Sequence, residues 1–309
     1  MDIIIENFTK KYGAQRAVDN ISFRVKTGEV LGFLGPNGAG KTTTMKAITT
    51  FLTPTEGKIH VGNFSVTEKS EEVKKHIGYL PENNPLYHDM PMIDYLDFVA
   101  RLQGIEKSRV KERILEMIRV CGLEEEKHKK IGELSKGYQQ RVGLAQAMIH
   151  DPEVLILDEP TSGLDPNQIV EIRELIKKIG KEKTVILSSH ILAEVEATCD
   201  RIMIINKGKI VADGSSAELR KHSQGREIIR TVIEDGEAKD IFNALQSLES
   251  VESVEFIDEN KNTFEIQSTP EKSSARSLFK LCVDKGWTIT EMTPVETKLE
   301  DIFRDLTMN

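Results

Sequence analysis

The sequence of 309 residues has few cysteines and no long apolar run. Cys121, Cys199 and Cys282 lie far apart without a C-x-x-C pair, which excludes a secreted disulfide framework and favours reduced thiols in a cytoplasm. No apolar stretch approaches the roughly 20 residues that cross a bilayer. The strand-like start at residues 1–6 has no basic region, so we expect neither a signal peptide nor a direct membrane span.

An excess of basic residues is also missing. The net charge is −8, and residues 221–309 carry 11 Lys or Arg against 18 Asp or Glu, whereas the first 220 residues are nearly balanced. Neither part has the basic footprint of a nucleic-acid-binding protein. The acidic C-terminal part would be repelled by anionic lipids. We therefore expect no nucleic-acid partner, and membrane association through a protein partner.

Residues 35–42 match the P-loop pattern G-x-x-x-x-G-K-[ST]. Residues 30–34 before them predict a buried strand, and residues 43–50 predict a helix. Backbone N–H groups in this turn would converge on phosphates, Lys41 would reach the β- and γ-phosphates, and the Thr42 hydroxyl would ligate Mg²⁺. A plain glycine-rich turn is the alternative, which Lys41 and Thr42 disfavour. The predicted nucleotide-binding residues are Gly35, Pro36, Asn37, Gly38, Ala39, Gly40, Lys41, Thr42 and Thr43.

Four further segments follow in a fixed order. Residues 133–141 contain L-S-K-G-Y, residues 154–160 form an apolar strand that ends in Asp-Glu, residues 162–165 read S-G-L-D, and residues 184–190 form a strand that ends in His. In this order and spacing, over roughly residues 1–220, the chain resembles the ATPase subunit of an ABC transporter. The resemblance implies an ATPase with the cofactors ATP and Mg²⁺.

The acids and the histidine have distinct expected roles. Asp158 supplies a hard oxygen to Mg²⁺, directly or through water, and Glu159 can polarise the attacking water as a general base. An Asp-Glu pair after a strand is otherwise a helix cap with a solvated neighbour. The resemblance implies that His190 contacts the γ-phosphate. Without the resemblance, we would interpret a lone His at a strand end as a structural residue.

The resemblance also implies an adenine site and a signature that acts in trans. Tyr12 falls where the family places an aromatic ring against adenine, and Val18 could line the other side of the base. Ser135 and Gly137 would meet the γ-phosphate bound by the opposite subunit. Lys136 replaces the usual glycine and adds a cation near that phosphate.

Two further positions complete the carry-over from the family. Asp165 closes the D-loop. Glu82 stands in the Q-loop where the family usually has Gln, which adds a negative charge beside phosphate and puts the coupling role of this loop in doubt. The usual consequence of the trans geometry is a head-to-tail homodimer or a paired ABC ATPase.

The length suits two domains. We predict a P-loop α/β ATPase domain over residues 1–220 with a helical subdomain at about 85–150, where apolar positions repeat at residues 92–102 and 110–120. Residues 226–309 follow the order β-α-β-β-α-β and predict a small ferredoxin-like α+β domain. Its last helix carries an apolar stripe at Leu299, Ile302, Phe303 and Leu306. The stripe packs either against the ATPase domain or its symmetry mate, or within its own domain.

The tail at residues 297–303 resembles ATPases of the ABC-2 exporter group, and residues 78–87 look closest to gliding-motility-associated ATPases. We therefore expect the energy-supplying subunit of an exporter, bound to separate polytopic membrane subunits on the inner face of the cell membrane. The alternative is a soluble ABC ATPase acting on ribosomes, DNA or protein assemblies. One cassette, no heptad run and no cysteine cluster disfavour that alternative.

Overall fold

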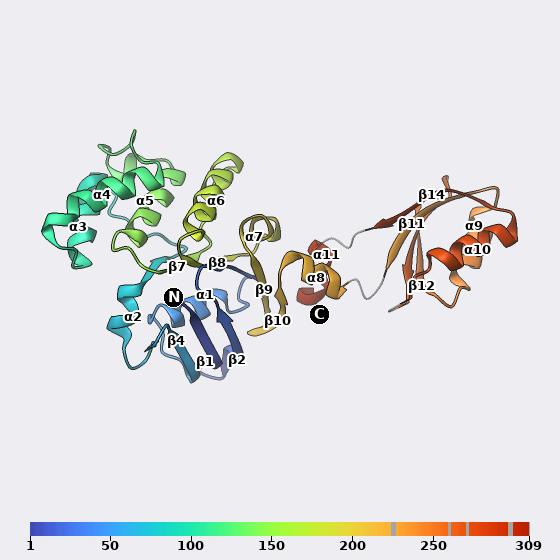
Figure 1. Cartoon of the computed structure of the whole chain (residues 1–309), viewed down its shortest axis with the longest axis horizontal. Helices are drawn as coiled ribbons and strands as arrows, with labels where there is room; N and C mark the ends of the chain where they lie inside the picture. The colour runs from blue at the N-terminus through green and yellow to red at the C-terminus, as the bar shows by residue number, and fades with distance from the viewer. Residues whose placement is uncertain (224–226, 259–260, 270–271, 296–298, 309) are drawn as a thin grey trace. The chain divides into compact units, whose positions relative to one another are not determined.

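The computed structural model describes residues 1–223, 227–258, 261–269, 272–295 and 299–308. Contacts between residues divide it into two compact units, Met1–Ser215 and Ser216–Met308 (Figure 1). The positions Gln224, Gly225, Arg226, Glu259, Asn260, Glu271, Thr297 and Lys298, which belong to the predicted boundary, loop, helix start and tail, lie outside the described residues.

The first unit is built on a six-stranded sheet in the order β10-β9-β3-β8-β7-β6. Its strands are β3 (Val30–Leu34), β6 (Ile77–Leu80), β7 (Val154–Asp158), β8 (Thr184–Ser189), β9 (Arg201–Asn206) and β10 (Lys209–Gly214). All pair in parallel except β10, which is antiparallel to β9. Every residue of β3, β7 and β8 is buried, as parallel strands covered on both faces require. Because these three strands are neighbours, the P-loop, the acidic pair and His190 follow them at one edge of the sheet.

A second, antiparallel sheet has the order β2-β1-β4-β5. It comprises β1 (Ile3–Tyr12), β2 (Gln15–Val25), β4 (Glu56–Val61) and β5 (Phe64–Ser65). Its apolar face shares one core with helix α1 (Lys41–Ile48), where Ile5, Phe8 and Met45 are buried. Alternation in β2 breaks at Asn20, which has φ +53°.

Three more helices cover the central sheet: α2 (Ser70–His76), α6 (Pro166–Gly180) and α7 (Leu192–Thr198). Asp165 precedes α6 as its N-cap, and its side chain accepts hydrogen bonds from two backbone N–H groups in the first turn of the helix. α7 packs closely on β3. A Cβ atom at Gly32 would lie 2.1 Å from Cγ1 of Val195, so only glycine at this position allows the helix to approach.

The inserted helical part consists of α3 (Met92–Leu102), α4 (Lys107–Cys121), a 3₁₀ turn (Ile131–Glu133) and α5 (Lys136–Met148). The helix predicted at residues 92–102 has these bounds, and α4 begins three residues before the predicted 110. Arg113 ties α4 to α5, because its guanidinium donates to the carbonyl oxygens of Met148 at 2.8 Å and Ile149 at 2.9 Å.

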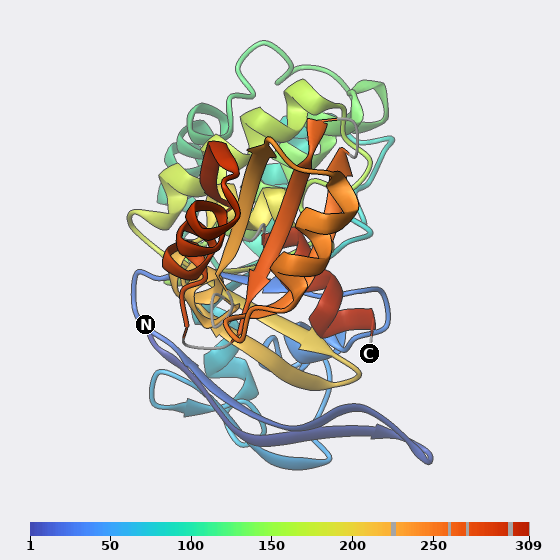
Figure 2. The ribbon, with the colours of Figure 1, turned by 90° about the vertical axis from the view of Figure 1, so that its right-hand side faces the viewer.

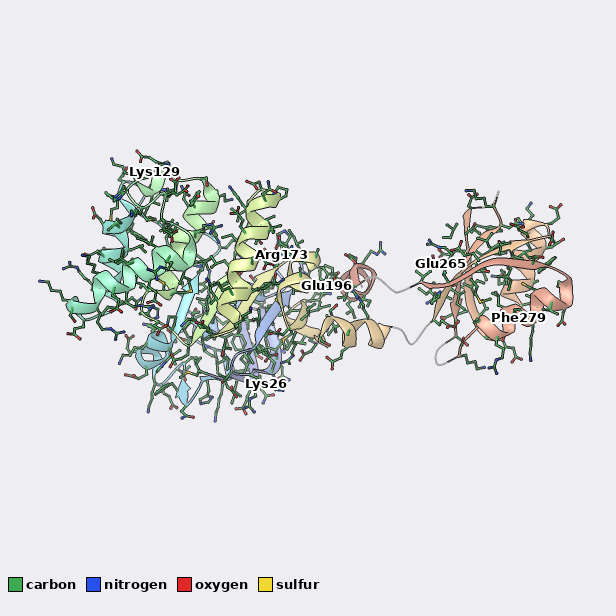
Figure 3. The ribbon with its side chains drawn as sticks, turned by 45° about the horizontal axis from the view of Figure 1, so that its top comes forward. Lys26, Lys129, Arg173, Glu196, Glu265 and Phe279 are labelled. Carbon is green, nitrogen blue, oxygen red and sulfur yellow. The ribbon has the colours of Figure 1, made fainter. Side chains whose placement is uncertain are left out.

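The second unit contains a four-stranded antiparallel sheet in the order β12-β13-β11-β14. Its elements are β11 (Ile228–Glu234), α9 (Ala238–Gln246), β12 (Val251–Asp258), β13 (Thr263–Ser268), α10 (Ala275–Lys285) and β14 (Thr288–Val295). This order and pairing are those of the predicted ferredoxin-like fold. Both helices lie on one face of the sheet (Figure 2), where Phe264 and Leu278 share a core. Glu265 pairs with Arg230 at 3.1 Å on the other face, and Phe279 points outward from α10 (Figure 3).

Two helices of the second unit contact each other, α8 (Ser216–Ser223) and α11 (Leu299–Met308). Leu219 of α8 is buried, as are Leu299 and Ile302 of the apolar stripe on α11. The short helix in the predicted boundary stretch therefore groups with the C-terminal unit. The helix that carries the stripe thus contacts α8, which lies outside the predicted domain of residues 226–309.

Candidate active site

The P-loop connects β3 to α1 by a turn that needs glycine at two points. Gly40 has φ +111°, and a Cβ atom there would lie 2.6 Å from the carbonyl oxygen of Ala17. A Cβ at Gly35 would lie 2.3 Å from the carbonyl oxygen of Ile205. The ammonium of the buried Lys41 donates to the carbonyl oxygen of Gly35 at 2.7 Å. This places the lysine charge at the N-terminus of α1, where backbone N–H groups also favour an anion.

Asp158 ends β7 and is fully buried. Its Oδ1 accepts hydrogen bonds from the hydroxyls of Ser188 at 2.6 Å and Thr42 at 3.2 Å. Within the described part of the chain, its Oδ2 is buried without a hydrogen-bond partner. A buried carboxylate oxygen that lacks a donor, beside a threonine hydroxyl, fits a hard cation. Thr42 and Asp158 are therefore the residues that could hold Mg²⁺.

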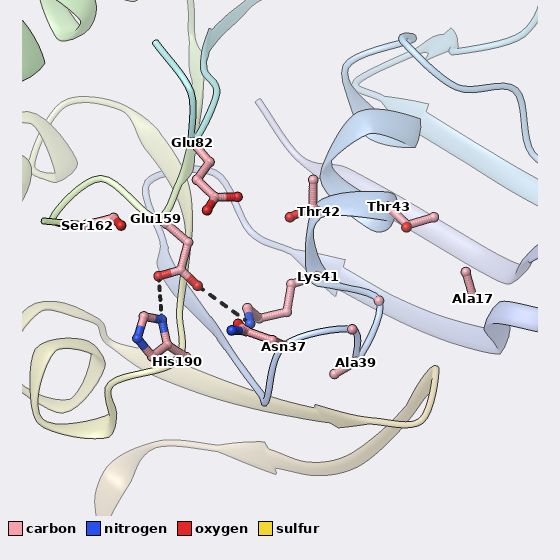
Figure 4. Close-up of a pocket in the computed structure, with 12 residues that line it drawn as sticks. Ala17, Asn37, Ala39, Lys41, Thr42, Thr43, Glu82, Glu159, Ser162 and His190 are labelled. Carbon is pink, nitrogen blue, oxygen red and sulfur yellow. Dashed lines mark hydrogen bonds and ion pairs between the residues drawn. The ribbon is translucent and has the colours of Figure 1, made fainter.

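Glu159 is held in an unusual backbone conformation with φ +50°, which is uncommon for a residue other than glycine. Its N–H donates to the Ser188 hydroxyl at 2.9 Å. Its Oε1 lies 3.5 Å from Nζ of Lys41, and its Oε2 lies 2.9 Å from Nδ1 of His190. The carboxylate is thus fixed between a cation and an imidazole, with one oxygen toward Lys41 of the P-loop and the other toward His190 (Figure 4).

These groups line one cavity of about 410 Å³. Its lining residues are Ala17, Asn37, Gly38, Ala39, Gly40, Lys41, Thr42, Thr43, Glu82, Glu159, Ser162 and His190. The cavity brings together most of the predicted site, including the Q-loop position Glu82. Gly35, Pro36 and Asp158 support it from behind through the contacts of Lys41 and Thr42.

The two positions expected around adenine are placed differently. Tyr12 ends β1 with 49% of its surface exposed, and Nζ of Lys10 lies 5.5 Å from its ring centroid. Val18 is fully buried in the core, and its neighbour Ala17 lines the cavity instead. Ser162 is the other lining residue that sequence reasoning missed. The sequence did carry a signal for it, because Ser162 begins the S-G-L-D segment. In the structure, its N–H donates to the carbonyl oxygen of Glu159 at 3.0 Å.

The signature residues are not among those that line the cavity of their own chain. Ser135 caps α5, with its hydroxyl accepting from the N–H of Tyr138 at 3.4 Å. Gly137 is buried beside Gln168. The Lys136 ammonium lies over the turn that precedes α6, 1.9 Å from where a Cβ atom would stand at Gly163.

The acids of the site affect the pKa of Tyr79 on β6. Burial raises the pKa of its phenol, and the negative charges of Asp158 and Glu82 raise it further. Its hydroxyl is buried and has no hydrogen-bond partner among the described residues. The phenol therefore remains neutral beside the carboxylates.

Comparisons with known proteins agree with this geometry. The family described as "ABC transporter" matches residues 18–162, and the family described as "ATP-binding protein DrrA1-3-like, C-terminal domain" matches residues 214–307. An uncharacterized ABC transporter ATP-binding protein of Bacillus subtilis, YxlF, is 36% identical over 97% of each chain. The bacitracin transport ATP-binding protein BcrA of Bacillus licheniformis is 39% identical over 71% of each chain.

A solved structure is also similar. The dimeric post-hydrolysis state of the ATP-binding cassette MJ0796, bound to ADP and Pi, is 26% identical and has a TM-score of 0.62 over 69% of this chain and 98% of the other. Within the described ranges, no helix combines the length and apolar character that crossing a bilayer requires. The match along nearly the whole chain and the assembled P-loop site place this chain in the family of ABC transporter ATP-binding proteins, which are ATPases.

Proposed function

We propose that this chain hydrolyses MgATP in the P-loop cavity to power an exporter, with Glu159 as the general base. The observation that carries the proposal is the convergence of Lys41, Glu159 and His190 within ion-pair and hydrogen-bond distance of one another in a single cavity. Lys41 binds the β- and γ-phosphates, and Glu159 takes the proton of the attacking water. His190 holds the carboxylate through its Nδ1, and we propose that its imidazole also contacts the γ-phosphate.

In this proposal, Mg²⁺ binds to the Thr42 hydroxyl and the Asp158 carboxylate. In P-loop NTPases, Mg²⁺ is held by the Ser or Thr hydroxyl of the P-loop and by an Asp carboxylate together with substrate phosphates, and Thr42 and Asp158 provide these two groups. When bound, the ion neutralises charge on the phosphates. Ser188 orients the Asp158 carboxylate by its hydrogen bond to Oδ1, which leaves Oδ2 for the cation.

Tyr12 stacks on the adenine in this proposal. The stacking of a base on an aromatic ring is worth about 1–3 kcal/mol, and nearly half of the Tyr12 surface is exposed for it. Val18 acts only as a core residue beneath Gly40, and Ala17 supplies the backbone and methyl group at the cavity wall.

The functional unit is a head-to-tail dimer, in which Ser135, Lys136 and Gly137 of one subunit close the cavity of the other. Two observations support this. The signature residues do not line their own cavity, and the similar cassette MJ0796 is a dimer with ADP and Pi. Asp165 positions the turn next to the signature by capping α6.

The dimer acts on polytopic membrane subunits at the inner, cytoplasmic face of the membrane. The bacitracin transport relative and the DrrA-like C-terminal match support an exporter of this kind. A gliding-motility role rests on residues 78–87 and on the tail alone. The soluble alternative, action on ribosomes, DNA or protein assemblies, has no support in the names of YxlF, BcrA or MJ0796.

Affinity purification of the tagged chain from detergent extract of its own organism tests this proposal. We expect polytopic membrane proteins to co-purify and the complex to hydrolyse ATP. Co-purification of ribosomes or DNA in their place would favour the soluble alternative.

A further inference from the structure

The carboxylate of Glu194 is buried, yet Glu194 is not among the residues that line the ATP cavity. It lies in the first turn of α7. Its Oε2 accepts hydrogen bonds from the hydroxyl of Thr161 at 2.6 Å and from the hydroxyl of Ser189 at 3.0 Å. Burying a carboxylate is costly without such donors. The two hydroxyls are therefore the partners that make its burial tolerable.

Both hydroxyl partners stand next to residues of the site. Thr161 follows Glu159 by two residues in the turn after β7. Ser189 directly precedes His190, and its hydroxyl also accepts from the N–H of Ile191 at 3.0 Å. Oε2 of Glu194 therefore links the turn that contains Glu159 to the end of β8, which His190 follows.

The helix that holds Glu194 is itself fixed. Val195 packs against β3 at Gly32, and the hydroxyl of Thr198 donates to the carbonyl oxygen of Glu194 at 2.7 Å. Glu159, by contrast, has a left-handed backbone conformation that persists only when its surroundings hold it. The hydrogen bond between Glu194 and Thr161 thus joins a fixed helix, α7, to a strained turn, the one after β7.

We propose that Glu194 is a positioning residue for ATP hydrolysis, which holds Glu159 in register with His190 through Thr161 and Ser189. The inference rests on the proposed function, because it assigns Glu194 to the alignment of the base proposed there. Loss of the anchor releases the turn, so the carboxylate of Glu159 leaves the geometry in which it meets water. A displacement of about 1 Å at a catalytic group can cost 10²-fold in rate.

Matched variants of the full chain test the anchor. Thr161→Val keeps the shape of the side chain and removes the hydroxyl, whereas Thr161→Ser keeps the hydroxyl. We expect Thr161→Val to lower kcat by about tenfold or more with the KM for ATP within about twofold of the parent. Thr161→Ser should stay near the parental rate. Glu194→Gln, which keeps an acceptor oxygen but loses the charge, should fall between the two.

A purely structural role would give a different pattern. It would lower the thermal midpoint and ATP binding together and leave kcat per folded molecule unchanged, which would overturn the proposal. Because Thr161 acts through Glu159, adding Thr161→Val to Glu159→Gln should cause no further loss of residual hydrolysis. A multiplicative further loss would contradict this route. If Thr161→Val does not fold, Ser189→Ala tests the same oxygen from the other side, and a parental kcat in Ser189→Ala would then refute the proposal.

These results separate the two proposals. If Glu159→Gln itself hydrolyses ATP at the parental rate, the assignment of Glu159 as the base in the proposed function fails. If Glu159→Gln is inactive while Thr161→Val and Ser189→Ala keep the parental kcat, only the role of Glu194 fails.

Discussion

Nζ of Lys41 and Oε1 of Glu159 lie 3.5 Å apart, and both side chains are buried. The P-loop cation and the proposed base therefore form one buried ion pair. Removal of one member of such a pair leaves the other charge buried without compensation. Loss of the Glu159 charge leaves the Lys41 ammonium free to bind phosphate, whereas loss of Lys41 removes a phosphate contact and leaves the Glu159 charge without its partner.

Lys41→Ala should weaken ATP binding by about 10- to 100-fold, because it removes hydrogen bonds between an ammonium and the phosphates that are worth roughly 1.5–3 kcal/mol. Equilibrium titration with a fluorescent ATP analogue measures the effect. Lys46→Ala, on an adjacent turn of α1 but absent from the cavity lining, is the matched control. Equal affinities of Lys41→Ala and the parent would contradict the placement of ATP in the P-loop.

The trans arrangement of the signature predicts complementation between two inactive chains. Lys41→Ala disables the P-loop, and Lys136→Glu should disable the signature by replacing the cation with an anion. In a head-to-tail dimer that pairs one chain of each variant, one of the two sites combines a native Lys41 with a native Lys136. ATP hydrolysis should therefore partly recover on mixing. If both halves of a site belonged to one chain, the mixture would stay inactive.

Gly163 predicts a loss of stability that comes from backbone strain in the turn before α6. Gly163→Ala strains a residue at φ +69°, at a cost of about 1–2 kcal/mol, and also displaces the Lys136 ammonium. Gly104→Ala is the matched control, because its φ of +73° gives the same strain while no atom lies within 4 Å of the added methyl. The ammonium ends a flexible, exposed side chain that can move aside at little cost, so we expect the two variants to lose nearly the same thermal stability.

The second half of this test is a double variant. Lys136→Ala combined with Gly163→Ala should be about as stable as Gly163→Ala alone, because the loss comes from backbone strain and not from displacement of the ammonium. A double variant clearly more stable than Gly163→Ala would show that displacement of the ammonium is costly.

His150 predicts a pH dependence of stability. Burial lowers its pKa, and the charges of Lys183 and Arg113 lower it further, while its hydrogen bond to the carbonyl oxygen of Ile77 opposes the shift. In the unfolded chain His150 therefore binds a proton near pH 6.5, whereas in the folded chain it binds this proton only at lower pH. Stability from this group is complete above pH 6.5 and is lost as the pH falls toward the folded pKa.

Denaturant unfolding of His150→Gln at pH 7.5 and pH 5.0 measures this contribution. Gln keeps a donor for the carbonyl oxygen of Ile77 and does not titrate, so this variant should lose less stability than the parent between the two pH values. An equal loss in both proteins would show that His150 does not titrate abnormally.

Much of the site follows from the sequence, because its parts are local. A strand followed by a P-loop or by an acidic pair places those residues at one sheet edge whatever else the chain does, as β3 and β7 show. Val18 could not be placed in this way. The irregularity at Asn20 shifts the alternation of β2, and a shift of one residue exchanges the two faces of a strand. That shift buries Val18 and turns Ala17 to the cavity.

Glu194 could not be found from the sequence either, because its role depends on a tertiary contact. Thr161 and Glu194 lie 33 residues apart, and only the packing of α7 against β3 brings them together. The pairing of α8 with α11 has the same character, since it joins segments from the two ends of the C-terminal unit.

Paired measurements of MgATP binding and steady-state hydrolysis in Glu159→Gln test the central claim most directly. The substitution removes a base and keeps the size of the side chain, so binding should persist while kcat falls by about 10²- to 10⁴-fold. His190→Ala, which removes the 2.9 Å contact to Glu159, should lose turnover in the same manner. Hydrolysis by Glu159→Gln at the parental rate would contradict the assignment of Glu159 as the base.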